Sequence, residues 1–381
     1  MRVLHVINQF CGRGGAEVSL REIVLGTQAP ELQHGIAVLD TGLNRFEGLA
    51  EAGIPTYEPP SSLRSRIRQI RHVRGAIRSF RPDLVHTTLF DADLAGRVAA
   101  KMARVPALTS LVNTPYVPEA VMDTNVSRLK MGGVRLIDTM LSRYATDAFH
   151  AITETVASWA IEYLGIDPMK ITVVPRGRSR AALGTPSAER RREVRGSLGL
   201  SDQTPVLINV ARQEAQKGQR FLLEALVDVR RRHPDVVLLL AGREGNRTAA
   251  LRRAVTGLSL GDTVRELGVR TDVPDLLSAA DVFVFPSLYE GLGGAVLEAM
   301  ALEVPIVASD VPAIMEVVDG DRCAILVPIR DSRALAKGIC GVLADPASAA
   351  ERAAAAARKF DATYELEISL EGMRRLYESL T

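Results

Sequence analysis

Cysteine is scarce in this sequence of 381 residues, which contains only Cys11, Cys323 and Cys340. An odd number of cysteines with no CxxC pair supports neither a disulfide framework nor a cysteine-based metal site. We therefore expect each cysteine to behave as a small buried hydrophobic residue, in a chain that stays in a reducing, cytoplasmic compartment.

Long apolar runs and an excess of one charge are also missing. No run approaches the roughly 18 to 20 apolar residues of a membrane helix, and residues 1–7 are too short for a signal-peptide core. The 47 Lys and Arg residues against 45 Asp and Glu residues give a net charge of +2. That balance lacks the basic excess of a dedicated nucleic-acid binder, so we expect no nucleic-acid partner.

The sequence does contain short β-branched runs that alternate with longer helical patterns. This alternation predicts parallel sheets covered by helices on both faces. The expected strands are too many for one sheet, so we predict an α/β protein with two Rossmann-like, doubly wound domains. Domain boundaries are expected at 1–178 and 179–359, with a helix at about 360–381 that packs back on the first domain. The strands are expected at residues 3–7, 36–39, 84–87, 107–112, 148–152, 171–174, 206–210, 236–240, 264–267, 282–285, 306–308 and 325–327.

A glycine-rich turn with Gly12, Gly14 and Gly15 follows the first expected strand. Such a turn lets the backbone approach an anion, and the next helix offers free N–H groups. The spacing begins like a dinucleotide-binding motif, but Glu17 occupies the position of its third glycine. We interpret the turn as a phosphate-binding loop of undefined kind, with a plain tight turn as the alternative.

Two cations follow the strand expected at 206–210. Arg212 comes at its carboxyl end and Lys217 at the start of the next helix, where open α/β sheets bind ligands. An arginine grips a diphosphate with two hydrogen bonds and a lysine acts as a point charge. The alternative is a pair of solvated surface cations.

A second glycine-rich turn follows the strand expected at 282–285. Gly291, Gly293 and Gly294 form another anion-binding turn, and the following helix directs its positive end there. Glu290 and Glu298 flank the turn and can accept hydrogen bonds from sugar or ribose hydroxyls. The alternative makes them a loop acid and a surface helix residue.

These motifs together resemble those of the retaining, GT-B-fold glycosyltransferases of family 4. The resemblance covers nearly the whole chain, is strongest over 206–327, and implies two Rossmann-like domains facing a cleft. Residues 1–178 would form the acceptor side and residues 179–359 the nucleotide-sugar donor side. The resemblance rests on Gly14-Gly15-Ala16-Glu17, Arg212 with Lys217-Gly218, Glu290-x7-Glu298, and the stretch 264–309.

The resemblance also implies roles for single residues. Arg212 and Lys217 would hold the diphosphate and stabilise the leaving nucleotide, and Glu290 would hold the sugar hydroxyls. The other donor contacts would be Gly14 and Gly15 at the phosphates, the backbone at Leu292, Gly293 and Gly294, Glu298 at the ribose, and Arg270 in the base-binding loop.

The implied reaction moves a sugar from a nucleotide-diphosphate sugar, with UDP- or GDP-sugars favoured, to an acceptor hydroxyl with retained configuration. Breaking the anomeric C–O bond builds negative charge on the diphosphate, which fixed cations and helix N-termini stabilise. We therefore predict neither cofactor nor metal. Asp91 and Asp93 are expected to cap a helix rather than bind a metal.

The sequence departs from the family pattern at two places. Asn113 stands where the family has a histidine that faces the donor sugar; it can offer a hydrogen bond but exchanges no proton as imidazole does. Arg176 and Arg178 replace polar linker residues and are expected to add two cations at the cleft. The nearby His86 matches another family histidine, and we expect it to be a structural, hydrogen-bonded residue.

An arginine-rich helical pattern occupies residues 61–81. Its apolar residues form one stripe, and its arginines follow the same spacing one residue later, with no acid between them. Such a helix can lie on the inner face of an anionic membrane or receive a phosphorylated acceptor. We favour a core-packed helix whose arginine stems cover apolar surface. The stripe consists of Leu63, Ile67, Ile70, Val73, Ile77 and Phe80.

Other functions remain open at this point. An NAD(P)-dependent oxidoreductase on two Rossmann-like halves is disfavoured by Glu17 and by the lack of a clear ribose-binding acid after it. A non-catalytic nucleotide-sugar-binding protein would bind donor without transfer, and a phosphorylase is a further alternative. The acceptor, whether a small molecule, a saccharide or a lipid-linked sugar, and the oligomeric state are not predicted.

Overall fold

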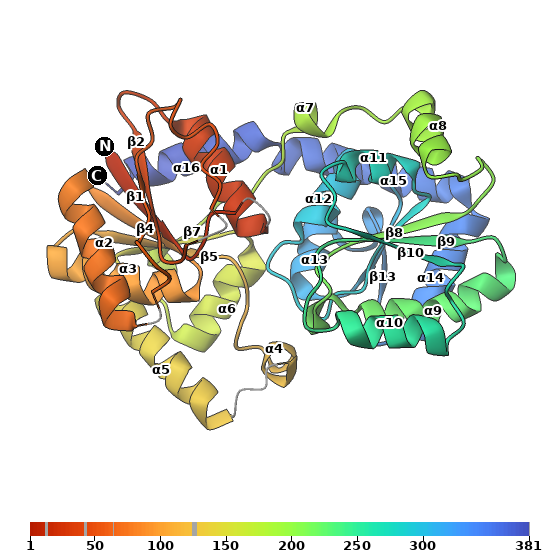
Figure 1. Ribbon diagram of the computed structural model, residues 1–381, viewed down its shortest axis with the longest axis horizontal. Coiled ribbons are helices and arrows are strands. Elements are labelled where there is room, and N and C mark those ends of the chain that lie inside the picture. The colour runs from red at the N-terminus through yellow and green to blue at the C-terminus, as the bar shows by residue number, and fades with distance from the viewer. Residues whose placement is uncertain (12–13, 42–43, 64, 124–127, 381) are drawn as a thin grey trace. The chain divides into compact units, whose positions relative to one another are not determined.

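A computed structural model describes residues 1–11, 14–41, 44–63, 65–123 and 128–380 of the chain. The chain divides into two compact α/β units, whose elements can be followed in Figure 1. Unit 1 consists of Met1–Tyr116, Asn125–Gly177 and Leu366–Thr381. Unit 2 consists of Val117–Thr124 and Arg178–Glu365, so a short segment from the first half of the sequence belongs to it.

The sheet of unit 1 is parallel throughout the described residues, in the order β3-β2-β1-β4-β5-β6-β7. The order reverses direction beside β1, because β2 pairs with one edge of β1 and β4 with the other. Its strands are β1 (Arg2–Ile7), β2 (Gln33–Val38), β3 (Thr56–Tyr57), β4 (Leu84–Thr88), β5 (Ala107–Leu111), β6 (Ala148–Ala151) and β7 (Ile171–Val173).

Helices cover the sheet of unit 1. The C-terminal α16 is one of them: it packs against α1, and its Tyr377 is fully buried. The helices are α1 (Gly15–Thr27), α2 (Arg66–Phe80), α3 (Phe90–Ala103), α5 (Arg128–Tyr144), α6 (Glu154–Leu164) and α16 (Leu366–Glu378), with a 3-10 turn η1 (Pro168–Lys170).

Unit 2 repeats the same arrangement with the order β10-β9-β8-β11-β12-β13, again parallel among the described residues. Its strands are β8 (Val206–Val210), β9 (Val237–Ala241), β10 (Val264–Gly268), β11 (Val282–Phe285), β12 (Ile306–Ser309) and β13 (Ile325–Val327). Its helices are α4 (Pro118–Asp123), α7 (Arg180–Leu183), α8 (Ala188–Ser197), α9 (Gln219–Arg232), α10 (Thr248–Gly257), α11 (Val273–Ala279), α12 (Gly294–Ala301), α13 (Pro312–Val318), α14 (Ser332–Ala344) and α15 (Pro346–Thr363), with 3-10 turns η2 (Ala215–Lys217) and η3 (Gly320–Arg322).

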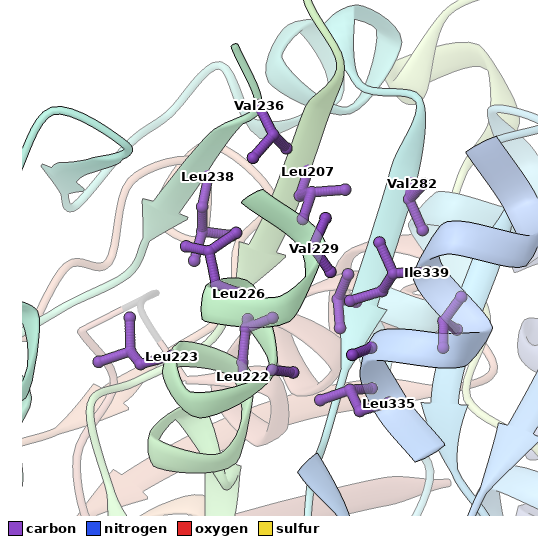
Figure 2. Close-up of a cluster of buried hydrophobic side chains, with 14 of the residues drawn as sticks. Leu207, Leu222, Leu223, Leu226, Val229, Val236, Leu238, Val282, Leu335 and Ile339 are labelled. Carbon is purple, nitrogen blue, oxygen red and sulfur yellow. The ribbon is translucent and has the colours of Figure 1, made fainter. Parts of the chain in front are cut away.

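The core of unit 2 lies between its sheet and the helices α9 and α14. Figure 2 shows Leu207 of β8 and Val282 of β11 beside Val229 of α9 and Ile339 of α14. Each such side chain contributes about 1.5 to 3 kcal/mol when it leaves water. This packing holds the carboxyl ends of β8 and β11 in fixed positions.

The alternation of strands and helices predicted from the sequence is confirmed. Each expected strand is present, with ends shifted by at most three residues, and only the two-residue edge strand β3 was missed. Local signals set several helix ends: Thr153 Oγ1 accepts a hydrogen bond from Val156 N at 3.1 Å to begin α6, and Gly165 ends it in the left-handed region.

The expectation that Asp91 and Asp93 cap a helix is wrong. Helix α3 begins after Leu89, and both aspartates lie inside its first turn without a side-chain cap hydrogen bond. The cap comes from the strand beside it: Asn8, just after β1, accepts a hydrogen bond from Ala92 N at 3.0 Å. Asp91 instead pairs with Arg66 of α2 at 2.5 Å.

The arginine-rich helix α2 buries most of its apolar stripe. Val73, Ile77 and Phe80 join the core against the sheet, whereas Ile67 stays exposed. This placement agrees with the core-packed interpretation. Arg64 lies outside the described residues, and membrane contact through 61–81 stays a prediction. Among the described residues, no helix is both long and apolar enough to cross a bilayer.

Candidate functional site

The loops at the carboxyl ends of β8 and β11 carry most of the predicted site residues. These two strands are neighbours, and the strand order of unit 2 reverses between them. Ligands of open α/β sheets bind at such reversals, because the flanking loops leave the sheet on opposite faces. Topology alone therefore points to residues 211–218 and 286–294.

Lys217 and Glu290 form a close ion pair at this position. Lys217 Nζ lies 2.5 Å from Glu290 Oε1, and the two side chains are only 13% and 7% exposed. Lys217 Nζ also lies 5.5 Å from the centre of the Phe285 ring. Burying two charges costs desolvation energy, so the pair restricts Lys217 to one direction rather than adding much stability.

The backbone between these two loops is tightly joined. Leu288 N donates to Gln216 O at 2.8 Å, and Gln216 Nε2 donates to Tyr289 O at 2.8 Å. Gly218 follows Lys217 with a φ of +60°, and a Cβ at this glycine would overlap the carbonyl oxygen of Pro286. Sequence reasoning missed Gln216, because nothing in its local pattern shows that it links the two loops.

Arg212 lies on the loop that also carries Lys217. Its guanidinium is exposed and lies 4.0 Å from Glu214 Oε1, at the limit of an ion pair. At that distance in solvent the pairing holds the arginine weakly. Arg212 can therefore turn toward an incoming anion at little cost.

The glycine turn after β11 leads into α12. Gly293 is the N-cap residue with a φ of +83°, and a Cβ there would lie 2.8 Å from Ile314 Cδ1. The N-cap residue makes no side-chain cap hydrogen bond, so the first N–H groups of this helix can donate to an acceptor from outside. Leu292 is buried.

Glu298 of α12 pairs with Arg178. Arg178 Nε lies 3.4 Å from Glu298 Oε1, and a Cβ on Gly294 would lie 2.7 Å from Arg178 Nη2. Burial raises the pKa of Glu298 above its usual value, and Arg178 partly offsets this. The structure thus places the guanidinium of Arg178 directly against the start of α12, which sequence reasoning did not predict.

The expectation that Arg176 and Arg178 add two cations at the cleft stays a prediction, and the structure shows how each side chain is held. Both side chains are buried, and Arg178 is engaged by Glu298. Arg176 belongs to unit 1 and lies near the buried His86 and His150, whose pKa values it helps to lower. Buried cations of this kind hold neighbouring groups in place rather than attract a distant anion.

Arg270 lies in the loop after the edge strand β10. It is exposed, and its Nε and Nη2 bind the two carboxylate oxygens of Asp272 at 2.7 and 2.5 Å. This fork fixes the arginine against its own loop.

The remaining predicted residues belong to unit 1. Gly14 is the N-cap residue of α1, and Gly15 is its exposed first residue. The Glu17 carboxylate accepts hydrogen bonds from Cys11 N at 3.1 Å and Cys11 Sγ at 2.8 Å, so a carboxylate already lies at this turn. Gly12 and Arg13 lie outside the described residues.

Asn113 follows β5 with its side chain exposed to solvent. His86, in contrast, is buried and hydrogen-bonded at both ring nitrogens, which agrees with its structural interpretation. Within the described ranges, no three His, Cys, Asp or Glu side chains are placed to share a metal ion.

Two family models match the chain. The glycosyl transferases group 1 model matches residues 204–345, and the glycosyl transferase 4-like domain model matches residues 14–177. The alpha-maltose-1-phosphate synthase of Mycolicibacterium smegmatis is 32% identical over 285 residues, which are 70% of this chain and 71% of that protein. The D-inositol 3-phosphate glycosyltransferase of Kineococcus radiotolerans is 29% identical over 387 residues, 95% of this chain and 87% of that protein.

Solved structures of similar fold cover nearly the whole chain. Anabaena HepE in complex with UDP-glucose has a TM-score of 0.85 and 22% identity, with 100% of both chains covered. Sucrose-phosphate synthase from Thermosynechococcus elongatus has a TM-score of 0.84 and 20% identity, with 100% and 99% of the two chains covered. These likenesses show that the two α/β units have the GT-B fold.

Proposed function

The chain belongs to the glycosyl transferases group 1 family and is a glycosyltransferase; we propose that it moves a sugar from a nucleoside-diphosphate sugar to an acceptor hydroxyl with retained anomeric configuration. The observation that carries this proposal is the buried Lys217–Glu290 pair, with the exposed Arg212 on the same loop as Lys217, where the strand order of unit 2 reverses. The UDP-glucose complex of HepE and the names of the curated relatives support this class of donor.

The leaving group is the proposed target of the two cations. When the anomeric C–O bond breaks, negative charge builds on the departing diphosphate. Lys217 is already oriented by Glu290, so its ammonium group needs no reorganisation to face this charge. Arg212 is free to turn, and its planar fork can bind two phosphate oxygens at once.

The sugar and the ribose are the proposed partners of the two glutamates. Glu290 uses Oε1 for Lys217, and its second oxygen can accept a hydrogen bond from a sugar hydroxyl. Glu298 is held by Arg178 at the start of α12, where it can accept from a ribose hydroxyl. The uncapped N–H groups of α12 would stabilise a phosphate or sugar oxygen.

We also propose that the reaction needs no divalent metal, because fixed cations and a helix N-terminus supply the positive charge at the leaving group. Transfer should then continue in EDTA at an unchanged rate. A rate that disappears in EDTA and returns with manganese would contradict this part of the proposal. The roles predicted for Gly14, Gly15, Asn113 and Arg270 stay predictions.

The donor can be identified with a thermal-shift screen over UDP-, GDP-, ADP- and TDP-sugars, followed by a transfer assay with the stabilising donor. We expect Lys217→Ala, Arg212→Ala and Glu290→Ala each to reduce transfer strongly, and near wild-type rates in all three would refute the site.

A protein that binds donor without transfer or hydrolysis would be a non-catalytic binder. The family does not favour the oxidoreductase alternative.

A further inference from the structure

Helix α5 of unit 1 presents its apolar side to solvent. Five large apolar residues on this helix are each more than half exposed, and they recur at helical spacing along one side. We call these residues the α5 face: Leu129, Leu136, Ile137, Met140 and Tyr144.

The side of α5 that faces the protein is held by polar contacts. The carboxylate of Asp138 accepts a hydrogen bond from Arg97 Nη1 at 2.7 Å and another from Tyr116 Oη at 3.0 Å. Ser142 Oγ accepts from Arg97 Nη1 at 3.3 Å. An amphipathic helix on the surface of a globular domain normally packs its apolar side against the core. Here these hydrogen bonds hold the polar side of α5 against the protein, so its apolar side faces solvent.

The exposed charged side chains of α5 whose burial is described all have one sign. Lys130, Arg135 and Arg143 are exposed on the same helix, and the only acid of α5, Asp138, is buried. The guanidinium of Arg135 lies 5.5 Å from the centre of the Tyr163 ring, and that of Arg143 lies 5.5 Å from the centre of the Tyr144 ring. The surface therefore combines apolar side chains with positive charge and aromatic rings.

We propose that the α5 face is a docking surface for an anionic lipid bilayer. Burying the apolar side chains at the headgroup boundary removes them from water, while the three cations contact acidic headgroups. A second copy of the chain fits less well, because a twofold contact through α5 would bring these cations against their own counterparts.

This inference differs from the membrane contact considered for residues 61–81. Helix α2 has more arginines, but most of its apolar side chains are buried in the core. Ile67 is its only largely exposed apolar residue. Positive charge without exposed apolar surface gives weak, salt-sensitive attraction. Helix α5 has both positive charge and exposed apolar surface. We therefore expect substitutions of exposed apolar residues to weaken membrane binding on α5 but not on α2.

The test is co-sedimentation of the full chain with vesicles of phosphatidylglycerol and phosphatidylcholine. Leu136 and Ile67 are matched for this purpose, since each is 62% exposed, one on α5 and one on α2. We expect Leu136→Ser to weaken vesicle binding by about tenfold or more and Ile67→Ser by less than about twofold. Arg143→Gln should weaken it about fivefold.

Three results would overturn the proposal. The first is no vesicle binding by the wild-type chain at low salt, and the second is an Ile67→Ser loss as large as that of Leu136→Ser. The third is a dimer in sedimentation velocity that Leu136→Ser dissociates, together with absent vesicle binding, which would assign the face to a second copy. All variants change exposed side chains, and unchanged thermal unfolding will confirm that they fold.

Discussion

The hydroxyl of Tyr377 lies 2.9 Å from Nδ1 of His86, although the two residues are 291 positions apart in the sequence. This contact joins the C-terminal helix α16 to strand β4 inside unit 1. It is the first link of a buried chain of hydrogen bonds that continues across the sheet through Ser110 and His150.

The direction of every bond in this chain follows from its last acceptor. The carbonyl of Val174 can only accept, so His150 Nε2 donates to it at 2.8 Å and His150 Nδ1 must accept from Ser110 Oγ. Ser110 then accepts from His86 Nε2, which leaves His86 Nδ1 to accept from the Tyr377 hydroxyl. Burial lowers the pKa of both histidines, so both are neutral, and these bond directions give each ring a single tautomer.

Tyr377→Phe should destabilise the protein, because it leaves His86 Nδ1 buried without a donor. An unsatisfied buried polar atom costs about 1 to 3 kcal/mol of unfolding free energy, measurable by urea denaturation. Ser379→Ala, on the segment just after α16, removes a hydroxyl that donates to Leu376 O at 2.8 Å and serves as the control. An equal, small effect in both variants would contradict the structural role of the Tyr377–His86 bond.

A second histidine predicts how stability depends on pH. His34 Nε2 donates to Thr27 Oγ1 at 2.8 Å, since that hydroxyl itself donates to Ile23 O, and His34 Nδ1 accepts from His5 Nε2 at 3.0 Å. Burial lowers the pKa of His34 from 6.5 to about 4. Between these two pH values the unfolded chain binds a proton that the folded chain does not.

The unfolding free energy should therefore fall as pH is lowered from 6.5 to 4, by up to about 1.4 kcal/mol per pH unit from His34 alone. His34→Gln keeps a donor and an acceptor but does not titrate, so its unfolding free energy should fall less steeply over this window. Asp93, whose pKa is raised to about 7 by burial, acts in the opposite direction in both proteins and cancels in the comparison. If the unfolding free energies of the wild-type protein and of His34→Gln changed in parallel with pH, His34 would not be buried in its neutral form.

Gly218→Ala should damage both stability and transfer. The left-handed φ of +60° disfavours any side chain, and the new Cβ would overlap the Pro286 carbonyl, which separates the loops that carry Lys217 and Glu290. We expect a loss of about 1 to 3 kcal/mol in unfolding free energy and a severe loss of turnover. Gly196→Ala is the matched control.

The control glycine lies inside α8, and a Cβ there meets nothing within 4 Å. Alanine is favoured over glycine in a helix by about 1 kcal/mol, so Gly196→Ala should stabilise the protein and leave transfer unchanged. Normal turnover in Gly218→Ala would show that the joined loops do not position the site.

Lys217 and Glu290 should act as one unit in transfer. Removing one preorganised charge that faces a developing negative charge costs about 10²- to 10³-fold in turnover, which we expect for Lys217→Ala. Because Glu290 orients the ammonium group, Glu290→Gln should lower turnover as well, and the double variant should be little worse than Lys217→Ala. If the loss of turnover in the double variant equalled the product of the two single losses, it would contradict this coupling.

Much of the fold and part of the site follow from local pattern. Alternating β-branched and helical segments are set by neighbouring residues, so the strand positions and the two α/β units were predicted. The residue types around Lys217 and Glu290 also stand out, because cations and glycines after buried strands occur where parallel sheets bind ligands. The helix cap at α3 was predicted wrongly, since its acceptor, Asn8, comes from another part of the chain.

The sequence by itself determined which segments are strands and helices, and which loops carry charge and glycine. Only the tertiary structure decided that Lys217 meets Glu290 across 73 positions, that Arg178 holds Glu298, and that α2 turns its apolar side inward while α5 turns its own outward. The physical reason is that periodicity gives a helix two unlike sides but does not say which one packs. That choice depends on partners, such as Arg97 for Asp138, that strand order brings together from distant positions.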